Sequence, residues 1–231
     1  MSQLPPPPPP PPPGSQPPPP PSPSTGGSFS VGEAISYGWS AYWKNVGPLV
    51  VMALIILVVN LFIVLIGSGV SGVAGRLVLQ LISFVVGIVL AMGLIRASLA
   101  VVEGRSPEVG LLFRSDGFGP YLVAAVLVTL GVAVGLVLCV VPGIILAVMW
   151  HFFGFVIVEN PDTSPVDAIR RSAEITRGYR WQLLGLGLLL IGINIVGALA
   201  CGVGLLFTYG ITAVTVAYAY KTLSGQPVVP A

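Results

Sequence analysis

Long apolar stretches separated by short polar ones dominate the chain from residue 48 onward. A helix of about 20 such residues crosses the hydrocarbon layer of a bilayer, at about 1.5 Å of rise per residue. The third and fourth stretches are separated only by a turn signal at 139–143, so they form either a full hairpin or a re-entrant pair. The pattern predicts an all-α fold, a polytopic transmembrane helical bundle of about six spans. The predicted spans are 48–66, 77–102, 121–141, 142–158, 181–200 and 202–220.

A polar segment between the fourth and fifth stretches carries the signals of an amphipathic helix. Ser164 is a suitable N-cap, Pro165 fits the first helical position and Asp167 complements the helix dipole. Gly178 is a suitable stop. At about 100° per residue, the charged residues fall in one arc and small or apolar residues fill the rest. We therefore expect this helix to lie along a membrane surface.

The chain restarts three times with a capped, acidic-first segment followed by an apolar hairpin. The restarts begin at Ser30, Ser106 and Ser164, and they read S-V-G-E-A-I, S-P-E-V-G-L and S-P-V-D-A-I. V-V-E precedes the second and I-V-E precedes the third. This repeat predicts three hairpins, each preceded by an amphipathic interfacial helix. In the first such helix, one side suits the headgroup level through its aromatic residues: Val31, Ile35, Trp39, Tyr42 and Trp43.

The N-terminal segment has a different composition. Residues 1–27 contain fifteen of the 23 prolines, so they cannot build a core and favour polyproline II. They are either an unstructured spacer or a docking ligand for a protein partner with an SH3-like or other aromatic groove. The predicted organisation is a disordered proline-rich cytoplasmic tail (1–27), a transmembrane helical domain (28–222) and a short C-terminal tail (223–231).

Composition excludes several classes of protein. The chain is 55% hydrophobic and 8% charged, against roughly 25% charged residues in soluble domains, which indicates an integral membrane protein. We expect no nucleic-acid binding, because there is no soluble basic domain. Cys139 and Cys201 are too few for a disulfide scaffold or a four-thiolate metal cluster, and we expect no cofactor. Both lie at predicted outer turns, where they form either a disulfide or two free thiols.

Positive charge predicts the orientation. All but one of the basic residues outside the spans flank them on one side, and only Arg76 lies on the other. This side should face the cytoplasm, so that both termini lie inside the cell membrane. Four arginines there are candidate contacts to anionic lipid, or they only obey the topology rule or pair with Asp167 and Glu174. These candidate contacts are Arg170, Arg171, Arg177 and Arg180.

Three polar residues are candidate intramembrane positions: Asn60, His151 and Asn194. They would either line a pathway, with His151 as a proton relay or ion contact, or form hydrogen bonds between helices. A single histidine without an acidic partner in any span cannot form a metal site or an acid–base pair. Gly131 and Gly135 have GxxxG spacing, which allows an oligomer interface or close packing within the chain.

Four motifs carry a resemblance to a known family. They are A-I-S-Y-G-W from Ala34, P-G-I-I-L-A-V-M-W from Pro142, S-P-V-D-A-I-R-R-S from Ser164 and T-R-G-Y-R-W from Thr176. Together they resemble bacterial multi-pass membrane proteins related to the glycerophosphodiester phosphodiesterase membrane domain. With its proline-rich head, the chain also resembles actinobacterial proline- and glycine-rich transmembrane proteins. The resemblance covers about residues 28–222 and implies a multi-pass fold. It implies no phosphodiesterase chemistry, because the catalytic barrel and its acidic metal ligands are absent from the sequence.

The function expected from these patterns is a non-enzymatic scaffold or accessory component of the cytoplasmic membrane, with an amphipathic collar against the bilayer. A small transporter or channel is the alternative, since midspan asparagine and histidine suit a pathway, although charged coupling residues are missing from the spans. An enzyme is not expected, because the sequence offers no nucleophile and base with an orienting group.

Overall fold

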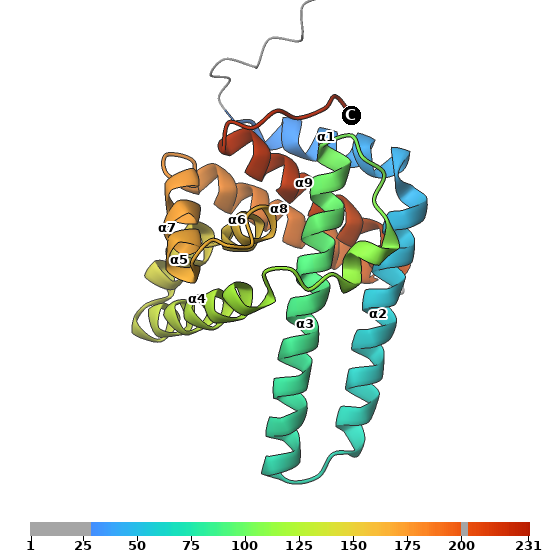
Figure 1. The fold of residues 1–231 in the computed structure, drawn as a ribbon, viewed down its shortest axis with the longest axis vertical. Helices are drawn as coiled ribbons and strands as arrows, with labels where there is room; N and C mark the ends of the chain where they lie inside the picture. The colour runs from blue at the N-terminus through green and yellow to red at the C-terminus, as the bar shows by residue number, and fades with distance from the viewer. Residues whose placement is uncertain (1–28, 200–202) are drawn as a thin grey trace, which may run out of the picture.

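A computed structural model describes residues 29–199 and 203–231 (Figure 1). Helices account for the fold, and the described residues contain no strand, which confirms the all-α prediction. The predicted tail 1–27 and Cys201 lie outside the described residues. The elements are α1 (Val31–Lys44), α2 (Val46–Gly69), α3 (Val73–Val102), the 3-10 helix η1 (Val109–Phe113), α4 (Phe118–Leu138), α5 (Val140–Met149), α6 (Phe153–Glu159), α7 (Pro165–Ile175), α8 (Arg180–Leu199) and α9 (Val203–Leu223).

Five segments are long and apolar enough to cross a membrane: α2, α3, α4, the α5–α6 pair taken together, and α8. The sixth predicted span corresponds to α9, which is not among them. Threonines and tyrosines are interspersed along α9, and it packs against α1, α2, α3 and α8 in the interior. The membrane prediction is thus confirmed in its coarse form, and the count of six is not.

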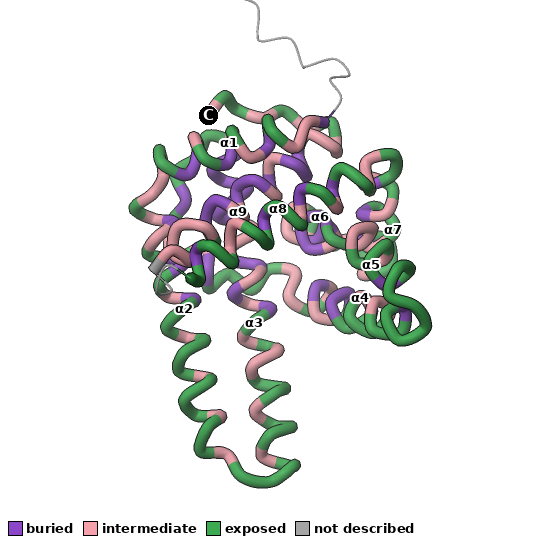
Figure 2. The backbone as a smooth tube through the Cα atoms, turned by 180° about the vertical axis from the view of Figure 1, so that it is seen from behind, coloured by how far each residue is buried: buried purple, intermediate pink, exposed green. Residues whose placement is uncertain are grey.

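The hairpins do not stand parallel. The α2–α3 hairpin projects from the rest of the molecule, and α4 runs crosswise to it in both views (Figures 1 and 2). The far end of the projecting hairpin is exposed on nearly all sides and carries large apolar side chains such as Phe62, Leu65 and Leu81. Apolar surface on this scale suits hydrocarbon surroundings. The predicted bundle of three hairpins is therefore not confirmed as an arrangement.

Helix α1 is attached to α9 by close packing. Ala34, Gly38 and Ala41 are buried on the face of α1 that meets α9. A Cβ atom at Gly38 would lie 1.9 Å from Oγ1 of Thr215, so only glycine permits this approach. The inward face of α1 is thus a row of small residues, which the amphipathic pattern alone did not reveal.

Packing against α9 gives the aromatic residues predicted on one side of α1 different surroundings. Trp39 and Trp43 are exposed, as headgroup-level residues would be. Tyr42 is fully buried, and its hydroxyl donates to the carbonyl oxygen of Leu206 at 3.3 Å. The placement of Tyr42 on the lipid side is therefore wrong, because α9 covers this position.

The second restart forms no amphipathic α-helix. Residues 105–108 are irregular, and η1 begins at Val109 without a side-chain cap. Leu112 of η1 is fully buried against α3, where a Cβ atom at Gly93 would lie 2.4 Å from the Leu112 Cα. The prediction is wrong here because the segment following Pro107 is mostly apolar, and tertiary packing draws it into the interior.

The capped helix of the third restart forms as predicted. The hydroxyl of Ser164 accepts a hydrogen bond from the Asp167 backbone N–H at 3.2 Å, and Pro165 is the first residue of α7. The helix ends at Ile175, three residues before the predicted stop at Gly178, which adopts a φ of 90° in the turn that leads to α8. Proline, cap and glycine therefore define this segment locally.

The GxxxG pair is used within the chain. A Cβ atom at Gly131 would lie 2.4 Å from the ring of Trp150, and one at Gly135 would lie 2.9 Å from the Gly143 Cα. These contacts join α4 to α5, and the turn between the two helices lies at Cys139, as predicted. The structure therefore confirms close packing within the chain at this pair, and the oligomer interface stays a prediction.

Candidate functional site

The fourth predicted span is broken in its middle. Helix α5 ends at Met149 and α6 begins at Phe153, which leaves backbone groups between them without helical partners. Ser172 of α7 satisfies two of them: its hydroxyl accepts from the Phe152 N–H at 3.0 Å and donates to the Met149 carbonyl at 2.8 Å. Thr176 donates to the same carbonyl at 3.4 Å. The buried face of α7 therefore stabilises a non-helical segment inside an apolar span.

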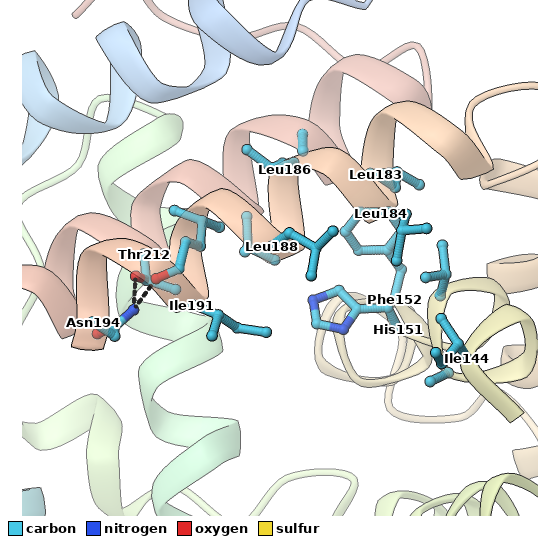
Figure 3. Close-up of a pocket in the computed structure, with 16 residues that line it drawn as sticks. Ile144, His151, Phe152, Leu183, Leu184, Leu186, Leu188, Ile191, Asn194 and Thr212 are labelled. Atoms are coloured by element: carbon cyan, nitrogen blue, oxygen red, sulfur yellow. Dashed lines mark hydrogen bonds between the residues drawn. The ribbon is translucent and has the colours of Figure 1, made fainter. Parts of the chain in front are cut away.

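A cavity of about 380 Å³ lies between this break, α8 and α9 (Figure 3). We call it the Asn194 cavity. Its walls are mainly apolar, and Leu183, Leu188 and Ile191 of α8 form one side of it. The polar side chains that line it include His151, Asn194 and Thr212, and the His151 ring points from the break toward α8 (Figure 3). The structure thus brings together two of the three candidate intramembrane positions.

The two asparagines have different surroundings. The Nδ2 group of Asn194 donates to the Leu190 carbonyl and to Oγ1 of Thr212 on α9, each at 2.8 Å. Its Oδ1 is buried and has no hydrogen-bond partner among the described residues. Asn60 is exposed on α2, and its amide donates to the Ile56 carbonyl of its own helix at 2.8 Å. Asn194 therefore joins two helices, whereas Asn60 lies apart from the cavity.

A second polar cluster, which sequence reasoning missed, lies where α3, α6 and α9 end. We call it the Lys221 cluster: Lys221, Glu103, Glu159, Tyr220 and Gln226. Nζ of the buried Lys221 lies 2.7 Å from a Glu103 carboxylate oxygen and 2.5 Å from one of Glu159. Gln226 accepts from Nζ at 2.6 Å, and the Tyr220 hydroxyl donates to Glu159 at 2.6 Å. The available signal was the repeated V-V-E and I-V-E, whose glutamates are these two.

Electrostatics favour the ionised form of Glu103. Burial alone would raise the pKa of Glu103, but hydrogen bonds and charge from Arg105 and Lys221 outweigh it and hold this pKa below its ordinary value. The C-terminal tail packs beside the cluster, since the Val229 N–H donates to the Val102 carbonyl at 3.1 Å. The cluster therefore fastens three helix ends and the tail to one another.

The four candidate arginines divide between two hollows. Arg170, Arg177 and Arg180 line one of about 540 Å³ at the α7–α8 corner, together with Glu174 and Trp181. We call it the arginine hollow. Nε of Arg180 is buried without a hydrogen-bond partner among the described residues, and Trp181 is 81% exposed.

The fourth arginine lies apart from that hollow. Arg171 lines the other hollow with several acidic residues, among them Glu159 and Asp162. Arg170 borders both hollows and lies 3.9 Å from Asp167, the one α7 ion pair among the described residues. The pairs spaced four residues apart on this helix, Asp167–Arg171 and Arg170–Glu174, are not formed among the described residues.

Comparison with known proteins finds a family that matches part of the chain. A family described as "Protein of unknown function (DUF975)" matches residues 119–226, which include the Asn194 cavity, the arginine hollow and most of the Lys221 cluster. The chain is similar to "Uncharacterized protein Rv2560" of Mycobacterium tuberculosis, with 29% identity over 232 residues, 88% of this chain and 71% of the relative. It is equally similar to "Uncharacterized protein Mb2590" of Mycobacterium bovis. No solved structure matches the chain significantly.

These matches support the general resemblance of the chain to uncharacterised bacterial proteins. They do not support the narrower resemblance to the phosphodiesterase membrane domain or to the proline- and glycine-rich group. The descriptions of these relatives name no activity, so only the geometry of this chain bears on its function.

Proposed function

We propose that the chain is a non-enzymatic scaffold or accessory component of the cytoplasmic membrane, whose α7–α8 corner binds the headgroup of an anionic lipid. The arginine hollow is the observation that supports this proposal. Guanidinium groups match phosphate oxygens in charge and in hydrogen-bond geometry. Trp181 lies beside them, and tryptophan favours the headgroup level. Beyond it, Leu188 and Leu189 of α8 are exposed, so hydrocarbon and headgroup contacts adjoin.

The hollow also has a fixed position relative to the spans. Arg170 of α7 and Arg177 just beyond its end are exposed, while Ser172 and the C-cap residue Thr176 are buried and bind the broken fourth span. A lipid held by the arginines is therefore coupled to the membrane domain through α7. Such coupling suits a protein that organises lipid or a partner at the inner leaflet.

Lipid retention by the full-length protein tests this proposal. Arg177→Gln combined with Arg180→Gln removes two charges from the hollow, and Arg171→Gln, which lines only the other, acidic hollow, is the control. At about 1 kcal/mol per arginine near an anionic surface, the double change corresponds to roughly a thirtyfold loss of preference at low salt. The measurement is the ratio of phosphatidylglycerol to phosphatidylcholine retained after purification from mixed vesicles. Equal losses of phosphatidylglycerol in the control and in the double variant would contradict binding at the arginine hollow. The arginines would then only follow the rule that places positive charge on the cytoplasmic side.

Orientation is a separate part of the proposal. Reporter fusions at Gly72, Val140 and Gly202 should report the outer side, and fusions at Ser115, Thr163 and the C-terminus the cytoplasm. The physical reason is the excess of lysine and arginine on the side of the polar segments. A fusion at Val140 that reports the cytoplasm would show that α4 and α5 do not form a complete hairpin across the membrane.

A small transporter is the second candidate, and the Asn194 cavity favours it because His151, Asn194 and Thr212 line one space between helices. Solute flux into liposomes that contain the full chain separates the two candidates. Flux that is abolished by His151→Leu and Asn194→Leu, but kept by Asn60→Leu on α2, would replace the scaffold proposal.

Partners other than lipid are also part of the scaffold proposal. A protein partner bound through the proline-rich tail should be recovered by crosslinking in the native membrane, and it should be lost when residues 1–27 are deleted. The exposed apolar end of the α2–α3 hairpin is available to a second copy of the chain, so an oligomer would be recovered in the same experiment from both forms.

A further inference from the structure

The Asn194 cavity is elongated along α8. Figure 3 shows Leu183 and Leu184 at one end of it and Asn194 and Thr212 at the other. Between Leu183 and Asn194, α8 rises by about 17 Å, at about 1.5 Å per residue. The hydrocarbon core of a bilayer is about 30 Å thick and holds two layers of acyl chains, so one chain measures about half of that. The cavity is therefore about as long as one acyl chain.

Helix α9 forms the inner wall of the cavity. Asn194 of α8 meets Thr212 of α9, and further along α8 Gly197 meets Gly204. Helix α9 therefore runs opposite to α8, and Ala219, which also lines the cavity, lies toward the end away from Asn194. Ala219 is buried and Thr212 is half-buried, so this wall is better shielded from the bilayer than the wall formed by α8.

The surface of the cavity is mainly apolar. Nδ2 of Asn194 donates to Oγ1 of Thr212 at 2.8 Å, so these two polar groups bind each other. Oδ1 of Asn194 is buried away from the open space. His151 is the one other polar side chain among the described residues that line the cavity. The cavity thus suits hydrocarbon, and its volume of about 380 Å³ falls within the range of small-molecule sites, roughly 300–1,000 Å³.

The outer wall of the cavity opens toward the bilayer. Ile144 of α5 and Leu188 and Ile191 of α8 line the cavity and are also exposed on the outside of the molecule. They belong to two segments that are long and apolar enough to cross a membrane. An acyl chain can therefore enter sideways from the hydrocarbon layer while the headgroup to which it is attached stays at the membrane surface.

One side of α8 joins the cavity to the arginine hollow. Arg180 lines the hollow, and Leu184 lines the cavity one turn further along the helix. Gly187 and Ile191 continue along the cavity on the same side, since residues three, four and seven apart share one side of a helix. This side of α8 is thus cationic at its start and apolar beyond, which is the order of phosphate and chain in a phospholipid.

We infer that one acyl chain of an anionic phospholipid lies in the Asn194 cavity while its phosphate lies in the arginine hollow. The inference rests on the proposed headgroup site and adds the second half of the ligand. An acyl chain has no hydrophobic reason to leave the hydrocarbon layer, but filling a space between helices gains dispersion contacts that the walls otherwise lack. The arginines therefore provide the preference for anionic lipid, and the cavity fixes the position of one chain beside the broken fourth span.

Photolabelling of the full-length protein in nanodiscs tests the position of the chain. The probes are phosphatidylglycerol with a diazirine near either the carboxyl end or the methyl end of one acyl chain, and phosphatidylcholine with the same chains. We expect the first diazirine position to label α9 near Ala219 and the second to label it near Thr212. Phosphatidylglycerol should label α9 at least about fivefold more than phosphatidylcholine, the preference that a single arginine contact provides. Labelling of α9 that is the same for both diazirine positions would overturn the inference.

Two glycines of α8 provide a matched pair that tests the location. Gly187 lines the cavity, whereas Gly192 does not, and a Cβ atom at either would meet nothing within 4 Å. Gly187→Leu should fill the cavity and reduce labelling of α9 by phosphatidylglycerol to the level of phosphatidylcholine. Gly192→Leu should leave the labelling unchanged. Equal labelling of α9 in the two variants would also overturn the inference.

Lipid retention separates the chain site from the headgroup site. Gly187→Leu leaves the arginines in place, so the purified variant should still retain phosphatidylglycerol in preference to phosphatidylcholine. If the unaltered protein shows this preference without labelling of α9, the chain site is overturned and the headgroup site stands. If the unaltered protein shows no preference, both are overturned.

A second variant keeps the test decisive if Gly187→Leu does not fold. Arg177→Gln combined with Arg180→Gln leaves the residues that line the cavity unchanged. Labelling of α9 by phosphatidylglycerol should fall to the level of phosphatidylcholine in this variant, because the phosphate is no longer held beside the cavity. Undiminished labelling would overturn the link between the phosphate and the chain.

Discussion

The two polar clusters of this apolar protein differ in how completely their hydrogen bonds are satisfied. In the Lys221 cluster, the ammonium group contacts three acceptors, and Glu159 also accepts from Tyr220 and Gln226. At Asn194, one buried acceptor has no partner among the described residues. A substitution in the first cluster would leave charged groups without a partner, whereas a substitution at Asn194 would remove an acceptor that already lacks one. We therefore assign the Lys221 cluster to architecture and expect Asn194 to contribute less to stability.

Loss of the cluster's cation should give the largest effect on stability. Lys221→Met leaves Glu103 and Glu159 partly buried without the charge they share, which we expect to cost about 3 kcal/mol or more of unfolding free energy. The measurement is thermal unfolding of the full chain in detergent. Lys44→Met, at the exposed end of α1, is the control.

A compensating variant separates charge from packing in the same cluster. Adding Glu103→Gln and Glu159→Gln to Lys221→Met removes both carboxylate charges that Lys221 neutralised and should recover most of the lost stability. A melting temperature for Lys221→Met equal to that of the unaltered protein would contradict the assignment of this cluster to architecture.

The cap on the broken span should give the next largest effect. Ser172→Ala leaves the Phe152 N–H without its partner and removes one donor to the Met149 carbonyl, at a cost of about 1–3 kcal/mol. Ser68→Ala, whose exposed hydroxyl bonds only within α2, is the control for chemical unfolding measurements. Equal stability of the two variants would mean that water or lipid replaces the Ser172 hydroxyl.

Acid should weaken the Lys221 cluster. The pKa of Glu103 is held below its ordinary value of 4.5, so its contribution to stability is complete above that value and is lost as the pH falls through the lowered value. Thermal unfolding between pH 7 and pH 3 should therefore show a decline in the acid range that is smaller in Glu103→Gln. An identical decline in that variant would assign the acid sensitivity to other carboxylates.

The smallest effect on stability is expected at Asn194, whose Oδ1 has no hydrogen-bond donor among the described residues. Asn194→Leu loses the bond to Thr212 but also removes the unpaired Oδ1, so unfolding free energy should change by less than about 1 kcal/mol. Unfolding of Asn194→Leu and Lys221→Met under one set of conditions tests the comparison directly. A loss at Asn194 as large as that at Lys221 would give the asparagine an architectural role as well.

The sequence predicted the features that depend on neighbouring residues. Ser164 caps α7 because its partner lies three residues away, and Gly178 adopts a positive φ because it has no Cβ atom. The apolar stretches predicted helices suited to a membrane for a similar reason, since helix length and hydropathy are properties of a single segment. The same local logic failed at Ser106, where tertiary packing of Leu112 outweighed the capping pattern.

Contacts between distant segments were decided by the tertiary structure alone. Hydrogen bonds of Glu159 to the cluster join residues 61–67 positions apart, and Ser172 reaches a break 20 residues away. The V-V-E and I-V-E repeat marked both glutamates, but nothing in it indicated that one lysine would be shared between them. The division of four arginines between two hollows, and the placement of His151 and Asn194 along one cavity, likewise depend on how the helices cross. Periodicity determines which face of a helix is polar, whereas only packing decides which other helix that face meets.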